Sequence, residues 1–101
     1  MVEPAKPDLS EHENRLRRLL AIARKVKNLT QRDIAARMGQ PRSFIGKIEN
    51  GTRGVSAVEL VAICRAIGTD PRRILTRLLK GWPDASAQAQ PPTEPPPQDS
   101  A

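Results

Sequence analysis

Residues 30–51 restrict the fold of this chain more than any other segment, because they predict two short helices joined by a tight turn. Thr30 is a favourable cap for the first helix, and Asp33 three residues later can bond back to the free backbone N–H groups, as in a capping box. Gly39 is suited to end this helix, since glycine adopts the left-handed conformation without strain. The apolar face of the helix comprises Ile34, Ala35 and Met38.

The second predicted helix begins near Pro41, a residue that a first helical turn tolerates. Its buried stripe contains Ile45 and Ile48, polar side chains occupy its other positions, and Asn50-Gly51 closes the unit. Two short helices joined by a short turn form the helix-turn-helix arrangement, whose second helix enters the major groove of DNA. The segment therefore predicts duplex DNA as a partner.

Positive charge is concentrated in the part of the chain predicted to fold. Residues 15–80 contain 16 Lys or Arg and four acids, a net charge of +12, whereas residues 1–14 and 81–101 each carry −3. A folded unit with this charge favours a polyanionic partner. The alternative is a well solvated surface, but 12 of the 17 basic residues are Arg, which favours recognition of phosphate and guanine.

Several classes of function lack the residues that they need. Cys64 is the single cysteine, which excludes a disulfide framework and a multi-cysteine zinc site, and its apolar surroundings favour a core position. His12 is the single histidine, and no nearby acidic cluster has the spacing of metal ligands. We therefore expect no catalytic residue, no metal and no cofactor, and the chain is not predicted to be an enzyme. One Phe, one Trp and no Tyr are too few rings to stack on unpaired bases.

The remaining patterns predict an all-α fold, a compact five-helix domain over residues 10–81. We expect residues 1–9 to form a flexible arm and the proline-rich residues 82–101 to form a disordered tail. No apolar run approaches the ~20 residues of a membrane span, and no signal peptide is evident, so we expect a cytoplasmic protein. Besides the two helices above, the predicted helices are 10–26 (Ser10 as cap), 56–67 (Ser56 with Glu59) and 70–80 (Asp70-Pro71).

Helical spacing also predicts which faces are buried. The inner faces comprise Leu16, Leu19, Leu20, Ala23 and Val26 or Lys27 in the first helix, and Ala57, Leu60, Val61, Cys64 and Ile67 in the fourth.

The fifth helix carries two apolar pairs, Ile74 with Leu78 and Leu75 with Leu79, about 100° apart around its axis. Since one pair suffices for a small core, we predict that Leu75, Leu79 and Trp82 contribute to a two-fold homodimer interface. The alternative is that all four aliphatic residues pack internally and Trp82 covers the helix end.

Three segments between Arg24 and Leu79 together resemble the lambda repressor-like, Cro/C1-type (XRE) helix-turn-helix regulators: LTQRDIAARMG, SFIGKIENG and VELVAICRAIGTDP, in this order. The resemblance implies a lambda repressor-like DNA-binding domain. It also implies a partly buried ion pair between Arg24 and Glu49, which joins the first helix to the end of the third. The implied phosphate-contacting residues are Gln31, Asn50, Thr52 and Arg53.

The resemblance places Arg42, Ser43 and Lys47 opposite base edges. Their chemistry agrees, because a guanidinium in the first helical turn can bond guanine O6 and N7 together. Phe44 either packs against the second helix or contacts a thymine methyl. Two departures from the family pattern are Gln40-Pro41 at the cap of the third helix, and Gly46 inside it, which costs about 1 kcal/mol against alanine and favours close approach to DNA or to another helix.

These features predict a sequence-specific, double-stranded-DNA-binding transcription regulator. We expect a dimeric repressor or autoregulator that occludes a pseudo-palindromic operator, with recognition helices about 34 Å apart. The alternative is an antitoxin or anti-activator that also binds DNA and holds a protein partner through the fifth helix or the tail. Activation through polymerase is less favoured, because only Glu49 and Glu59 are candidates for an acidic contact.

Overall fold

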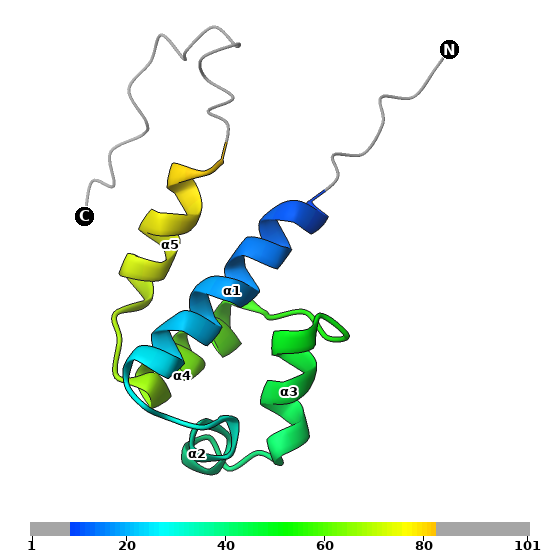
Figure 1. Cartoon of the computed structure of the whole chain (residues 1–101), viewed down its shortest axis with the longest axis vertical. Helices are drawn as coiled ribbons and strands as arrows, with labels where there is room; N and C mark the ends of the chain where they lie inside the picture. The colour runs from blue at the N-terminus through cyan, green and yellow to red at the C-terminus, as the bar shows by residue number, and fades with distance from the viewer. Residues whose placement is uncertain (1–8, 83–101) are drawn as a thin grey trace, which may run out of the picture.

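The computed structural model describes residues 9–82, which form five helices and no strand (Figure 1). The predicted all-α, five-helix architecture is confirmed. The arm and the tail expected at the two ends lie outside the described residues, apart from Leu9 and Trp82. No helix in residues 9–82 is long and apolar enough to cross a membrane. The helices are α1 (Ser10–Val26), α2 (Gln31–Arg37), α3 (Arg42–Asn50), α4 (Ala57–Ile67) and α5 (Pro71–Lys80).

The N-termini of α2, α4 and α5 are capped by the residues that the sequence indicated. The Thr30 hydroxyl accepts from the Asp33 N–H at 3.0 Å, and the Asp33 carboxylate accepts from the Thr30 N–H at 2.8 Å. Ser56 and Glu59 form the same reciprocal box at α4. The Asp70 side chain accepts from the backbone N–H of Arg72 at 2.9 Å. Each side chain satisfies a backbone donor that has no partner inside its helix.

Two predicted helix starts are wrong by one residue. Ser10 is the first residue of α1 and Leu9 occupies the cap position. Pro41 is the cap of α3 rather than a residue of its first turn, and it makes no side-chain capping bond. With φ of −66° and ψ of 152°, Pro41 fixes the chain direction into α3 through its ring alone. Gly39 has the left-handed conformation that was expected there, and left-handed residues also follow α1, α3 and α4, at Asn28, Gly51 and Gly68.

The core is aliphatic, as the lack of aromatic residues requires. Cys64 is fully buried, and burial, aided by the charge of Asp70, raises the pKa of its thiol to about 11. The inner face of α4 was predicted wrongly in part: Ala57 is exposed, Val61 is 41% exposed, and Ile63 is buried instead. Val26 and Lys27 at the end of α1 are both exposed. The buried apolar residues are Leu20, Ile34, Ala35, Ile45, Ile48, Leu60, Ile63, Cys64, Ile67 and Ile74.

Figure 1 shows α1 lying diagonally between α5 and α3, and α1 contacts both of them. Two arginines donate hydrogen bonds to the C-terminal ends of other helices. Arg15 of α1 donates to the carbonyl oxygens of Leu78 and Arg77 in the last turn of α5, at 2.9 and 3.1 Å. Arg37, the last residue of α2, donates to the carbonyl oxygen of Ala66 in α4 at 2.7 Å. These bonds satisfy carbonyl groups that a helix C-terminus leaves without an internal partner.

Candidate nucleic-acid interface

The two sides of α3 differ in character. Ile45 and Ile48 are buried against the core, whereas Arg42, Ser43 and Lys47 are exposed. The face expected to meet base edges therefore points away from the protein. Arg42 and Lys47 take part in no ion pair within residues 9–82. Both cations are thus free to bind an external anion or acceptor.

The C-terminal end of α3 is fixed by a network of three side chains from three helices. Glu49 of α3 accepts from Arg24 of α1 through both carboxylate oxygens, at 2.7 and 2.9 Å. Glu49 also accepts from the Gln31 side-chain amide of α2 at 2.9 Å. The Arg24 guanidinium donates further to the carbonyl oxygen of Leu29 at 2.7 Å. Two-point bonding of this kind sets the direction of α3 relative to α1.

Burial and hydrogen bonding oppose each other at this pair, whose side chains are only 10% (Arg24) and 13% (Glu49) exposed. Burial alone would raise the pKa of Glu49, but the bonds from Arg24 and Gln31 outweigh it and lower the pKa below its ordinary value. The hydrogen bond to Glu49 raises the pKa of Arg24. Both groups are therefore charged at neutral pH.

Gly46 lies where Gln31 crosses α3. A Cβ built on Gly46 would lie 3.6 Å from Gln31 Oε1, which is ordinary van der Waals contact. An alanine at position 46 would therefore fit against α2, so the contact between α2 and α3 does not require this glycine. Close approach to DNA stays a prediction.

The loop after α3 contains a second ion pair, which the sequence did not indicate. Arg53 donates to both carboxylate oxygens of Glu59, at 2.9 and 2.6 Å, and its guanidinium carbon lies 4.5 Å from the centre of the Phe44 ring. The bond from Arg53 lowers the pKa of Glu59 to about 2, assisted by the backbone N–H of Ser56. Phe44 is half-buried against the core. Phe44 thus packs against the core and against Arg53, and a contact with a thymine methyl stays a prediction.

The other residues implied to contact phosphate are exposed, and two of them bond to each other. The Asn50 side-chain oxygen accepts from both the backbone N–H and the hydroxyl of Thr52, at 3.0 and 2.8 Å. The Asn50 amide nitrogen makes no hydrogen bond within residues 9–82. Arg53 uses three of its five N–H donors internally, on Glu59 and on the carbonyl of Gly54.

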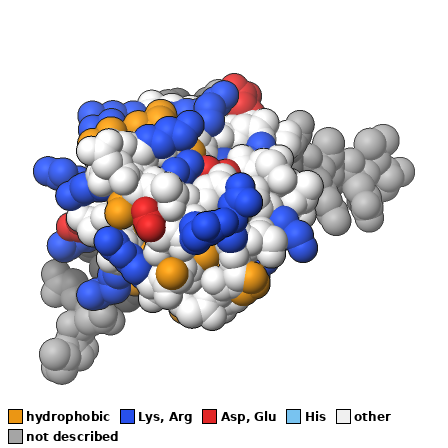
Figure 2. Space-filling model, turned by 60° about the horizontal axis from the view of Figure 1, so that its bottom comes forward, with side chains coloured by type: hydrophobic (Ala, Val, Ile, Leu, Met, Phe, Trp, Pro, Cys, Tyr) orange, Lys and Arg blue, Asp and Glu red, His pale blue; other side chains and the backbone are white. Residues whose placement is uncertain are grey.

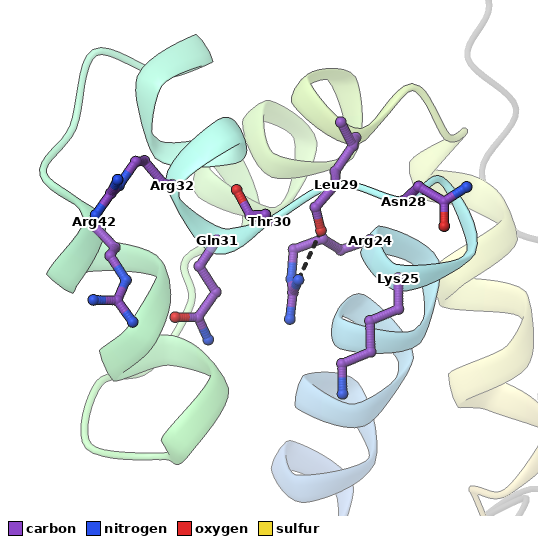
Figure 3. A pocket seen from close by; sticks show the side chains of 8 residues that line it. All are labelled: Arg24, Lys25, Asn28, Leu29, Thr30, Gln31, Arg32 and Arg42. Atoms are coloured by element: carbon purple, nitrogen blue, oxygen red, sulfur yellow. Dashed lines mark hydrogen bonds between the residues drawn. The ribbon is translucent and has the colours of Figure 1, made fainter.

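A shallow hollow of about 700 Å³ lies beside α3. Figure 3 shows Arg42 of α3, Gln31 of α2 and Lys25 of α1 extending toward the same space. No acidic residue lines it. Figure 2 shows Lys and Arg side chains spread over this end of the molecule and few acids among them. The hollow is lined by Arg24, Lys25, Asn28, Leu29, Thr30, Gln31, Arg32 and Arg42.

Comparison with known proteins identifies the fold to which this surface belongs. The model of a helix-turn-helix family matches residues 20–74, more than half of the chain. An XRE-family like protein from Pseudomonas syringae pv. tomato str. DC3000 superimposes with a TM-score of 0.70 and 39% identity, over 73% of this chain and 90% of that one. The chain belongs to the XRE-type helix-turn-helix regulators. This family consists of DNA-binding transcription regulators, which are not enzymes.

Two further relatives of this XRE-type regulator are controller proteins. Control protein C.SmaI of Serratia marcescens is 33% identical over 54 residues, which are 54% of this chain and 64% of that protein. The match thus spans less than two thirds of this relative's length. The restriction-modification controller protein C.AhdI from Aeromonas hydrophila has a TM-score of 0.57 and 31% identity, over 61% of this chain and 94% of that one.

The residues expected at a dimer interface of the XRE-type regulator lie at the surface of α5. Leu75 is 42% exposed, Leu79 is 65% exposed and Trp82 is 39% exposed, whereas Ile74 is buried. The alternative in which all four aliphatic residues of α5 pack internally is therefore wrong. Trp82 stacks on the His12 ring with the centroids 3.6 Å apart. No cluster of three metal-ligating side chains exists in residues 9–82.

Proposed function

We propose that this XRE-type regulator binds a pseudo-palindromic DNA operator as a homodimer and represses a promoter, its own among the candidates. The observation that carries the proposal is the free polar face of α3. Arg42, Ser43 and Lys47 are exposed while the opposite side of the same helix is buried in the core. This is the arrangement in which a recognition helix can enter the major groove while its domain stays folded.

The three side chains have complementary capacities for base edges. Arg42, in the first turn of α3, can donate two parallel bonds to O6 and N7 of guanine. Lys47, one turn and a little further along α3, can donate to the same kind of atom on another guanine. Ser43 can donate or accept. We assign Phe44 to the support of this face, because Phe44 packs against the core and under Arg53.

Contacts to the DNA phosphate backbone would position α3 in the major groove without distinguishing base sequence. Gln31 has one amide N–H beyond its bond to Glu49, and Asn50 has its amide group free of the turn with Thr52. Together with Thr52 and the two remaining donors of Arg53, these groups lie beside the middle and the C-terminal end of α3. We propose them as phosphate contacts.

Dimer formation explains the apolar surface of α5. Leu75 and Leu79 on α5 and Trp82 just after it are large exposed apolar side chains, which is costly unless a partner covers them. A second copy related by a two-fold axis would cover them with the same residues. The resulting pair of recognition helices would fit half-sites about 34 Å apart.

Repression is favoured over activation by the state of the two acids near α3. Glu49 is bound by Arg24 and Gln31, and Glu59 is bound by Arg53. Neither carboxylate is free to contact polymerase. Without a free acid beside α3 to contact polymerase, binding over a promoter favours repression by exclusion.

Selection of bound duplexes from a random pool tests the proposal. We expect a pseudo-palindrome with half-sites one helical turn apart, and a dimer in sedimentation of the protein. Arg42→Ala should weaken the selected site by about 1–3 kcal/mol and relax preference at one position of each half-site. The matched control is Arg65→Ala, since Arg65 is exposed on α4 and forms no ion pair within residues 9–82. Equal affinity of the wild type for selected and random duplexes would contradict the proposal.

A further inference from the structure

A second cationic surface lies on α1, outside the residues assigned above. A hollow of about 380 Å³ is lined by Asn14, Arg17, Arg18, Ala21, Lys25 and Glu49. It adjoins the hollow of Figure 3, because Lys25 lines both. Arg18, Ala21 and Lys25 are spaced by three and four residues and so share one face of α1. We call these three residues the α1 row.

The charge of this surface is not compensated. Glu49 is the single acid among the residues that line the two hollows, and Arg24 already neutralises it. Arg18 and Lys25 are exposed and take part in no ion pair within the described residues. Arg17 differs, since its guanidinium donates to the Asn14 side chain and lies over Gly51. Neither cation of the row is therefore held in an internal ion pair, although the charge of Lys25 helps to lower the pKa of Glu49.

The spacing of the row suits a phosphate backbone. Lys25 follows Arg18 by seven positions, which corresponds to about 10 Å along a helix. Nucleotides of one DNA strand rise by about 3.4 Å each, so the row spans roughly three of them. Ala21 lies between the two cations, and its short side chain does not fill the hollow. Because Lys25 and Arg42 border the same space, a backbone that follows the edge of the groove entered by α3 reaches the row (Figure 3).

We propose that the α1 row is a DNA-backbone contact, in which Arg18 and Lys25 each bind a phosphate beside the groove that α3 enters. This inference rests on the proposed function and adds a contact surface to it. The α1 row contributes to affinity but not to base preference, because the phosphates that it binds are the same in every DNA sequence. The competing interpretation is that both cations only attract DNA from a distance, as any positive charge of the domain does.

The test compares two double variants that remove the same charge. Arg18→Gln with Lys25→Gln removes the row. Lys27→Gln with Arg73→Gln is the control: both residues line the groove between α1 and α5, and Lys27 lies about 200° around α1 from Lys25. All four side chains are exposed, so both proteins are expected to fold. Affinity for a selected operator and for a random duplex is measured between 50 and 200 mM salt.

Loss of two phosphate contacts should lower the slope of log affinity against log salt by about 1.8. The affinity deficit of the row variant should therefore be about tenfold larger at 50 mM than at 200 mM salt, equally for operator and random duplex. Base preference should be unchanged, and the control should keep the wild-type slope. Equal slopes for the row variant and the control would overturn the inference and leave the proposed function intact. Failure of the wild type to select any duplex would instead overturn the proposed function.

Discussion

Arginine is used in opposite ways in two regions of this molecule. Between the helices, Arg15, Arg24 and Arg37 each donate to a carboxylate or to backbone carbonyls of another segment. On the surface formed by α2 and α3, Arg32 and Arg42 are exposed and form no ion pair within residues 9–82. The residue type is the same in both regions, and the difference lies in whether an acceptor is within reach.

This contrast separates stability from recognition. An arginine bound inside the fold fixes the position of a helix, so its removal leaves an acceptor without a partner and lowers the free energy of unfolding. A free arginine on the recognition surface contributes little to folding and is available to a phosphate or a base. Variants of the first kind should change stability first, and variants of the second kind should change DNA affinity alone.

The largest expected effect is at Arg24. Arg24→Ala leaves Glu49 largely buried without its main partner, and loss of one member of such a pair costs on the order of 3 kcal/mol of unfolding free energy. Urea denaturation followed by circular dichroism measures this loss. Arg42→Ala, the matched surface variant, should stay within about 0.5 kcal/mol of the wild type. A similar loss in both variants would remove the distinction between the two regions.

A double variant tests whether the pair of Arg24 and Glu49 orients α3. Arg24→Met with Glu49→Leu replaces both charges by apolar side chains, which should restore most of the lost stability. Gln31 then loses its acceptor, and α3 loses the bonds that set its direction. We therefore expect weaker operator binding from a protein of near-normal stability. Wild-type affinity in this variant would show that the pair does not orient α3.

A smaller effect is expected where α1 meets the end of α5. A Cβ on Gly81 would overlap the Arg15 guanidinium, so Gly81→Ala must displace this group from the carbonyls of Arg77 and Leu78. We expect a loss of about 1–2 kcal/mol in urea denaturation. Gly54→Ala is the control, because a Cβ at Gly54 meets nothing within 4 Å.

The mechanism at Gly81 can be isolated by a double-mutant cycle. Arg15→Ala should lose a similar amount, and Gly81→Ala added to Arg15→Ala should lose little more, since the two changes remove the same bonds. Additive losses would contradict the proposed displacement of Arg15.

The sequence predicted those features that depend on neighbouring residues. The Thr30 and Ser56 capping boxes need only a partner three residues away, and both are present in the structure. The face of α3 was also predictable, since helical spacing separates Ile45 and Ile48 from Arg42. The inner face of α4 was less determined, because Val61 and Ile63 are both apolar and only packing decides between them.

Patterns of neighbouring residues could not predict contacts between residues that are distant in the sequence. The partners of Arg15 are backbone carbonyls more than 60 residues away, and no side chain marks them in the sequence. The partner of Arg37 is likewise a carbonyl, at Ala66. The bond of Arg53 to Glu59 was missed for another reason: Glu59 already had a role in the capping box, and its second use requires the loop conformation. The free and the bound arginines therefore looked alike in the sequence.

The smallest expected effect is at Arg53, which belongs to the bound group yet lies beside the recognition surface. Because the folded-state pKa of Glu59 is about 2, below its ordinary value of 4.5, the pair stabilises the fold fully above pH 4.5 and loses this contribution as the pH falls toward 2. Glu59→Gln keeps a residue that a capping box accepts but removes the charge. The difference in unfolding free energy between wild type and variant should therefore shrink between pH 5 and pH 2.

The same variant changes Arg53 from an arginine bound inside the fold to one without an internal carboxylate partner. Without the Glu59 carboxylate, the guanidinium has more donors for a phosphate after α3, so duplex affinity at pH 7 should be retained or increased while stability falls slightly. Denaturation across this pH range and salt titration of duplex binding measure the two effects separately. A fall in both stability and affinity would mean that Arg53 supports the recognition surface only while bound to Glu59, and that a bound arginine cannot be converted into a free one by removing its acceptor.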